Sequence, residues 1–229
     1  TLLTMVPTEH MRAELAASGF RNLRVVARGV DTQLFTPERR SEALRREWGV
    51  TPDTPVVIHV GRLAAEKNLM ALIAGFIAIR HSQPHARLVL VGDGPEQNAL
   101  RNRLPDAIFA GTRRGSDLAA HYASGDIFLF PSLTETFGNV TVEAMASGLP
   151  LVAYDYAAAA QHVRHGVNGL LAGYGSTNDF TAKASELAIK QLQAPEQFSA
   201  LGRNARLTAE SLDWKYVVQQ LESLLFSIA

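Results

Sequence analysis

The sequence contains no cysteine among its 229 residues. This excludes disulfide bridges, thiolate zinc sites and cysteine nucleophiles, and it fits a reducing compartment. The formal net charge is also zero, because 22 Lys and Arg residues balance 22 Asp and Glu residues. No overall basic field attracts nucleic acid or an anionic membrane, so an anion site has to be local. We expect a cytoplasmic protein that binds no nucleic acid.

Long apolar runs are absent as well. No run reaches the roughly 18 to 20 residues of a transmembrane helix, and residues 1–7 lack the basic start of a signal peptide. The hydrophobic content of 47% is nevertheless enough for a full core. Because the chain begins with Thr1 rather than Met, we interpret it as a fragment of a longer protein.

Several ligand-binding motifs are missing. Gly92-Asp93-Gly94-Pro95 is the nearest approach to Gly-x-Gly-x-x-Gly, and it lacks the third glycine, which disfavours NAD binding. There is no Walker A pattern, no Asp-x-Asp pair and no Gly-x-Ser-x-Gly elbow. His162 and His165 lack further zinc ligands, and His59 is interpreted as a core or pocket-edge residue. We therefore expect no metal and no cofactor.

Short apolar runs alternate with helical patterns from Pro55 onward. The run Val56–Val60 is almost continuously apolar, as in a strand buried on both faces, and a helix is expected over 67–81. Six such strands predict an α/β fold with a doubly wound, Rossmann-like parallel sheet. The expected strands are 56–60, 87–91, 107–110, 126–130, 150–154 and 169–172.

Both ends of the chain lie outside this alternation. Residues 1–28 read as strand, helix and strand, which is too little to bury a core of its own. From about Thr177 the pattern is helical, with breaks expected near Pro195, Gly202 and Leu212. Ser211 is the expected cap of a last helix. One stripe of that helix is apolar: Trp214, Val217, Val218, Leu221, Leu224 and Leu225.

The stretch 130–144 carries the first candidate site. A loop with Glu135 leads into a helix that opens near Gly138 and Asn139, and a helix N-terminus favours a phosphate. Glu143 shares a helix face with Asn139 and can accept hydrogen bonds from the paired hydroxyls of a sugar. The alternatives are a dipole-stabilising acid at Glu143 and a solvated charge at Glu135.

The loop after the first buried strand carries the second candidate site. It places a flexible glycine at Gly61, a guanidinium at Arg62 and an ammonium at Lys67. A lysine at a helix start is unfavourable to the helix dipole, so we expect either an anion or Glu66 as its partner. Arg62 and Lys67 together could neutralise a diphosphate. The alternative is a pair of solvated surface cations.

Taken together, several motifs resemble the C-terminal half of the retaining glycosyltransferases of the GT-B fold, family 4 (glycosyl transferases group 1). They occur in family order over about residues 25–220. The motifs are Gly61-Arg62-Leu63-x-x-Glu66-Lys67-Asn68, Val91-Gly92-Asp93-Gly94-Pro95, Asp126-x-Phe128-x-x-Pro131-Ser132, Glu135-x-Phe137-Gly138, Glu143-Ala144-Met145-Ala146-x-Gly148-x-Pro150 and Gly166-x-x-Gly169-x-Leu171.

The resemblance implies a metal-independent transfer of a sugar from a UDP- or GDP-sugar, with retention of configuration. Arg62, Lys67 and Glu135 are the implied catalytic residues, the two cations lying on the diphosphate and Glu135 near the transferred sugar. Glu143 is implied to bind the ribose, and Gly111 to Arg113 lie where the base is expected. The implied donor-binding residues are Gly61, Arg62, Lys67, Glu135, Phe137, Gly138, Asn139 and Glu143.

The resemblance also implies a domain division. Residues 1–28 correspond to a remnant of the N-terminal acceptor domain with its linker, and residues 29–229 to the donor-binding domain with a C-terminal crossing helix. The acceptor, a lipid or a glycan, would bind the missing N-terminal domain, and the full-length protein could sit peripherally on a membrane. This fragment alone is expected to be inactive. A nucleotide-sugar epimerase or hydrolase of the same architecture and a non-catalytic nucleotide-binding module remain alternatives.

Overall fold

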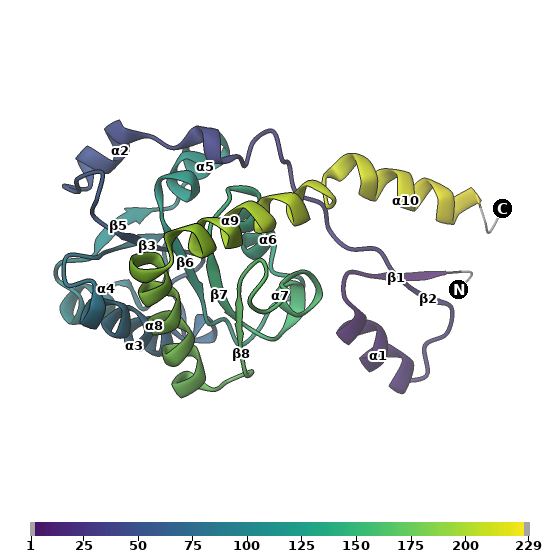
Figure 1. The fold of residues 1–229 in the computed structure, drawn as a ribbon. Coiled ribbons are helices and arrows are strands. Elements are labelled where there is room, and N and C mark those ends of the chain that lie inside the picture. The colour runs from purple at the N-terminus through teal and green to yellow at the C-terminus, as the bar shows by residue number, and fades with distance from the viewer. Residues whose placement is uncertain (1–2, 227–229) are drawn as a thin grey trace.

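The computed structural model describes residues 3–226, and a six-stranded parallel sheet forms the centre of its main domain (Figure 1). The strand order is β5-β4-β3-β6-β7-β8, and a separate two-stranded parallel sheet pairs β1 with β2. The predicted parallel sheet is thereby confirmed. The strands are β1 (Thr4–Val6), β2 (Leu23–Val25), β3 (Val56–Val60), β4 (Arg87–Val91), β5 (Ile108–Gly111), β6 (Ile127–Phe130), β7 (Leu151–Tyr154) and β8 (Leu170–Ala172).

Helices cover both faces of the large sheet. Buried side chains of α3, α4 and α8 pack on one face, those of α5, α6 and α7 pack on the other, and those of α9 contribute to both core clusters. The α-helices are α1 (Glu9–Ala17), α2 (Glu42–Glu47), α3 (Leu69–Ser82), α4 (Gln97–Arg103), α5 (Gly115–Ser124), α6 (Asn139–Ala146), α7 (Ala157–His162), α8 (Thr177–Gln193), α9 (Pro195–Glu210) and α10 (Trp214–Phe226). Two short 3-10 helices are η1 (Pro37–Arg39) and η2 (Ala65–Lys67).

Strand β3 lies at the centre of the sheet, between β4 and β6. All five of its residues are buried, as the apolar run predicts. In register, Val60 pairs with Val91 of β4, and Ile58 pairs with Phe128 of β6. The carboxyl ends of these three parallel strands therefore meet at one edge, which is where ligands bind in open α/β sheets.

Two predictions about the C-terminal helices are wrong. Gly202 does not break a helix but lies inside α9, where an added Cβ would sit 2.3 Å from the carbonyl oxygen of Gly148. The glycine allows α9 to approach the end of α6 closely. Ser211 closes α9, because its hydroxyl donates to the Thr208 carbonyl at 2.7 Å. The side chain at the start of α10 is Asp213, which accepts from the Lys215 N–H at 3.1 Å.

The segment 29–32, which follows β2, is joined to the start of α10. The Val30 N–H donates to the Leu212 carbonyl at 3.0 Å, and the Trp214 N–H donates to the Val30 carbonyl at 3.3 Å. Asp213 also accepts hydrogen bonds from the backbone and hydroxyl of Thr32. An added Cβ at Gly29 would lie 2.7 Å from the Trp214 side chain, so glycine is required for this close approach.

Beyond this junction, α10 and the β1-α1-β2 unit extend from the same side of the main domain (Figure 1). No residue of α10 is buried, and its apolar stripe includes Trp214 and Val218, which are 47% and 48% exposed. Within residues 3–226, no helix combines the length and apolar character needed to cross a membrane.

Candidate functional site

Two loops lie side by side beyond β3 and β4. The Gly61 N–H donates to the Val91 carbonyl, and the Leu63 N–H donates to the Asp93 carbonyl, each at 2.9 Å. Gly92 has φ of +134°, and a Cβ there would lie 1.9 Å from the Gly61 carbonyl oxygen. The glycines of the second loop therefore pack against the first instead of forming a dinucleotide fingerprint, and they fix the path of the loop that carries Arg62.

Arg62 and Lys67 occupy different environments although both come from this loop. The Arg62 side chain is 67% exposed and pairs with Glu66 at 3.5 Å. Lys67 lies in η2, two residues before α3, and its side chain is only 14% exposed. The predicted helix start at Lys67 is thus displaced, because Asn68 adopts a left-handed conformation between η2 and α3.

Lys67 forms an ion pair with Glu135 from the loop after β6. Of the two expected partners, an anion or Glu66, the structure does not show Glu66, which contacts Arg62 instead. Ser132 joins the cluster: its hydroxyl donates to the Glu135 carboxylate at 2.8 Å and lies 3.4 Å from Lys67 Nζ. The Lys67 ammonium also lies 5.6 Å from the ring centroid of Phe130. The structure thereby joins two loops that are 68 residues apart.

Helix α6 begins beside this cluster without a side-chain cap. Gly138 precedes it with φ of +95°, a conformation that favours glycine, and within residues 3–226 the helix start has no side-chain cap hydrogen bond. The Asn139 Oδ1 is buried and has no hydrogen-bond partner among the described residues. Phe137 is buried in the core, so only its backbone can face a ligand. The uncapped dipole end can accept an anion.

Glu143 lies one turn into α6 and is paired from the neighbouring helix. The Tyr122 hydroxyl of α5 donates to the Glu143 carboxylate at 2.9 Å. Burial raises the pKa of the Glu143 carboxyl above its ordinary value, and the hydrogen bond from Tyr122 opposes that change. Sequence reasoning missed Tyr122, because a tyrosine inside a buried helix carries no local signal of its partner.

A pocket of about 270 Å³ continues the site past Gly61 and Arg62 toward the end of β5. It is also lined by Thr112 and Arg113, so the segment expected to lie near the base borders the same hollow. The Arg113 guanidinium is held by the Ala110 carbonyl at 2.8 Å. The role of this segment in base binding stays a prediction.

His59 is a hydrogen-bonded core residue, as expected. Its Nδ1 lies 2.9 Å from the Leu129 carbonyl oxygen, and its Nε2 is buried with no partner among the described residues. Burial lowers the pKa of His59 to about 4, from an ordinary value of 6.5. The neutral ring therefore donates from Nδ1 to the carbonyl. Within residues 3–226 no group of three His, Cys, Asp or Glu side chains could hold a metal ion.

The buried His59 predicts acid lability. Because its pKa is lower in the folded than in the unfolded chain, its stabilising contribution is present above pH 6.5 and is lost as the pH falls toward 4. The difference between the two pKa values of His59 corresponds to about 3 kcal/mol of unfolding free energy. His59→Phe should reduce the loss between pH 7 and pH 4.5 in urea unfolding, with exposed His81→Phe as the control. An equal loss in both variants would contradict this.

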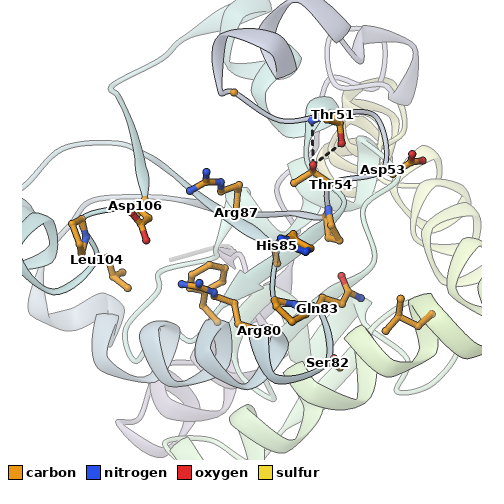
Figure 2. Close-up of a pocket in the computed structure, with 18 of the residues that line it drawn as sticks. Thr51, Asp53, Thr54, Arg80, Ser82, Gln83, His85, Arg87, Leu104 and Asp106 are labelled. Atoms are coloured by element: carbon orange, nitrogen blue, oxygen red, sulfur yellow. Dashed lines mark hydrogen bonds between the residues drawn. The ribbon is translucent and has the colours of Figure 1, made fainter.

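A larger pocket lies at the opposite edge of the sheet. It has a volume of about 790 Å³ and borders the residues just before β3, β4 and β5. Figure 2 shows the arginines Arg80 and Arg87 among its lining side chains. Arg80 lies in the last turn of α3, where a cation stabilises the helix dipole. None of the predicted site residues lines this pocket.

Comparison with known proteins places the fold and the motifs in one family. The family model described as glycosyl transferases group 1 matches residues 54–189, which is more than half of the chain. The chain belongs to the glycosyl transferases group 1 family. A sulfoquinovosyl transferase, SQD2, of Arabidopsis thaliana is 35% identical over 236 residues and covers 99% of this chain. A GDP-mannose-dependent alpha-mannosyltransferase of Corynebacterium glutamicum is 36% identical and covers 86%.

Solved structures agree with this membership and with the GT-B fold. The crystal structure of Anabaena Alr3699/HepE in complex with UDP and glucose matches with a TM-score of 0.82, 27% identity and 99% coverage of this chain. Sucrose-phosphate synthase from Thermosynechococcus elongatus matches with a TM-score of 0.81, 25% identity and 98% coverage. This group 1 chain spans about half the length of the curated relatives, 45% and 46% of the two named above, and 63% and 58% of the two structures.

Proposed function

We propose that this chain is the donor-binding half of a retaining glycosyltransferase that uses a UDP- or GDP-linked sugar. The observation that carries the proposal is the Lys67–Glu135 ion pair beside the uncapped start of α6, at the carboxyl edge of the sheet. A partly buried ammonium and a helix dipole suit the diphosphate, and the carboxylate suits sugar hydroxyls. One named relative is GDP-mannose-dependent, and the Anabaena structure contains UDP and glucose.

In this proposal, Arg62 and Lys67 act on the leaving group. Breaking the bond between sugar and diphosphate leaves negative charge on the departing phosphate, and fixed cations stabilise it electrostatically. Lys67 pairs with Glu135, so a bound diphosphate has to share or replace that contact. Arg62 is exposed and only loosely paired, so it can turn to the phosphates at little cost. No metal ion is needed for these steps.

Glu143 is proposed to bind the ribose, which gives a specific prediction. Glu143→Ala should weaken the binding of UDP or GDP by about 10-fold, because charge-assisted hydrogen bonds to the ribose are lost. It should leave the binding of pyrophosphate unchanged.

Because burial raises the pKa of the Glu143 carboxyl, nucleotide affinity should fall on acidification at a higher pH than for an exposed glutamate. Titrations by calorimetry should show this pH dependence in the wild type and not in Glu143→Gln. Equal losses of nucleotide and pyrophosphate would remove the ribose role.

We also propose that an N-terminal acceptor domain covers the parts that extend from the main domain. The described residues 3–28 contribute only β1, α1 and β2, and α10 carries an apolar stripe with no buried residue. The acceptor, lipid or glycan, would bind that domain, with the full-length protein in the cytoplasm or peripheral to a membrane. Without that domain, the chain should still bind the donor, but it should transfer sugar poorly.

The direct test is calorimetric titration of UDP and GDP into the wild-type chain. We expect one of the two to bind in the micromolar to low millimolar range, and addition of EDTA to leave the affinity unchanged. A chain that binds neither nucleotide at millimolar concentration would overturn the proposal.

A further inference from the structure

The loop that carries Glu135 is held through its backbone by three donors from other elements. The Tyr174 hydroxyl donates to the Leu133 carbonyl at 2.6 Å, and the Tyr156 hydroxyl donates to the Glu135 carbonyl at 3.4 Å. The Ala158 N–H donates to the Phe137 carbonyl at 2.7 Å. The acceptors are the carbonyls of alternate residues, 133, 135 and 137.

The two tyrosines support each other. Tyr156 follows β7 and Tyr174 follows β8, and their ring centroids lie 4.9 Å apart. Tyr154 at the end of β7 packs edge-on against Tyr174 at 6.1 Å, and its hydroxyl accepts from Asn68 at 3.0 Å. Although Tyr174 is 55% exposed, its hydroxyl is thus aimed at the loop by neighbouring rings.

The backbone near these tyrosines is itself constrained. Ala157 has φ of +51°, an uncommon conformation for a residue with a side chain. It directly precedes Ala158, whose N–H bonds to Phe137. Such strain persists only where surrounding contacts enforce it, and it clusters at functional sites.

The same loop also contacts the segment that carries Lys67. The Leu133 N–H donates to the Glu66 carbonyl at 3.0 Å, and the Glu135 carboxylate contacts Lys67 and Ser132. The tyrosine hydroxyls therefore hold the backbone of the segment, while Lys67 contacts the Glu135 side chain. A shift of this backbone would move the Glu135 carboxylate away from the place where the sugar is expected.

We propose that Tyr156 and Tyr174 form a tyrosine clamp that positions Glu135 for the transferred sugar. They are positioning residues, since their hydroxyls act on the loop backbone that carries Glu135. The clamp rests on the proposed function for the identity of the ligand. It assigns to these tyrosines a selective effect: they should matter for a nucleotide sugar and not for the nucleotide alone.

Phenylalanine substitutions test the clamp, because they keep the rings and remove only the hydroxyls. Tyr156→Phe and Tyr174→Phe should each weaken UDP-glucose or GDP-mannose, whichever the wild type binds, by about 5-fold, and the double variant by about 20-fold. Binding of UDP or GDP should change less than about 2-fold, since the diphosphate and ribose contacts remain. Tyr216→Phe, on exposed α10, is the matched control and should leave both affinities unchanged.

Hydrogen exchange gives a second readout that does not depend on a ligand. Amides within residues 132–138 should exchange faster in the double variant than in the wild type, while those of β3 and β4 stay unchanged. Equal losses of nucleotide and nucleotide sugar, or unchanged exchange in the loop, would overturn the clamp and leave the donor site standing. If the wild type binds neither nucleotide, the proposed function fails, and the exchange rates alone decide whether the tyrosines hold the loop.

Discussion

Lys67→Ala is expected to weaken UDP or GDP by about 100-fold, more than any other substitution in the candidate site. Its ammonium is largely shielded from solvent, so water and salt screen its attraction to a diphosphate weakly. The substitution also leaves the Glu135 carboxylate without its counter-ion, which adds repulsion against the phosphates. Arg62 is 67% exposed, and Arg62→Ala should therefore cost only about 5-fold.

Calorimetry at fixed ionic strength measures these losses, and two further variants separate their causes. Lys67→Ala combined with Glu135→Gln should recover part of the affinity, because the unpaired carboxylate is gone. Lys183→Ala on α8, where the lysine pairs with Glu186 at 3.2 Å, is the matched control and should bind like the wild type. Wild-type affinity in Lys67→Ala would show that the diphosphate binds elsewhere.

Asp126→Ala should lower the free energy of unfolding by about 3 to 5 kcal/mol, because it leaves a buried charge unpaired. The charge belongs to Arg45, which is 0% exposed and contacts Asp126 Oδ2 at 3.1 Å. Asp126 also accepts from the Val56 N–H at 2.8 Å and from Arg40 at 3.0 Å. The motif residue Asp126, directly before β6, thus joins α2 and Arg40 to the start of β3, at the other end of these strands from the candidate site.

Urea unfolding at pH 7 measures this loss. Glu186→Ala removes an ion pair whose acid is 44% exposed, and it should change the unfolding free energy by less than about 1 kcal/mol. Below the unfolding midpoint, the folded Asp126→Ala chain should keep its nucleotide affinity. A small effect on stability, similar to that of Glu186→Ala, would show that the carbonyl partners of Arg45 suffice to hold its charge.

The sheet could be predicted from the sequence because its strands are buried on both faces. Short, almost continuously apolar runs such as Val56–Val60, bounded by turn residues, are typical of strands buried on both faces. Parallel strands connected by helices then place their carboxyl ends at one edge, so the loops carrying Lys67 and Glu135 were expected together. The order of the strands came only from the structure.

The pairing within the site could not be predicted, because it depends on contacts between distant segments. Glu66 is adjacent to Lys67 in sequence, yet the ammonium pairs with Glu135. Tyr122, Tyr156 and Tyr174 act from helices and loops whose local patterns indicate only packing. Sequence spacing reports which residues share an element and not which elements touch.

The same limit explains the two errors in the C-terminal helices. A glycine in a helical pattern usually signals a break, but Gly202 is needed where α9 meets Gly148. Ser211 has the chemistry of an N-cap, but Asp213 stands at the start of α10 instead, where its carboxylate also accepts a hydrogen bond from Thr32. In both cases a neighbour remote in sequence decided the local structure.

The junction at Val30 has a consequence for engineering this domain. Because Val30 is hydrogen-bonded to Leu212 and Trp214, the chain enters and leaves the domain that contains the six-stranded sheet at one point. Residues 31–212 therefore form a cassette with adjacent ends. Such a topology suits circular permutation: a short peptide can join the two ends, and new ones can be opened at the exposed turn around Gly166 without cutting a strand.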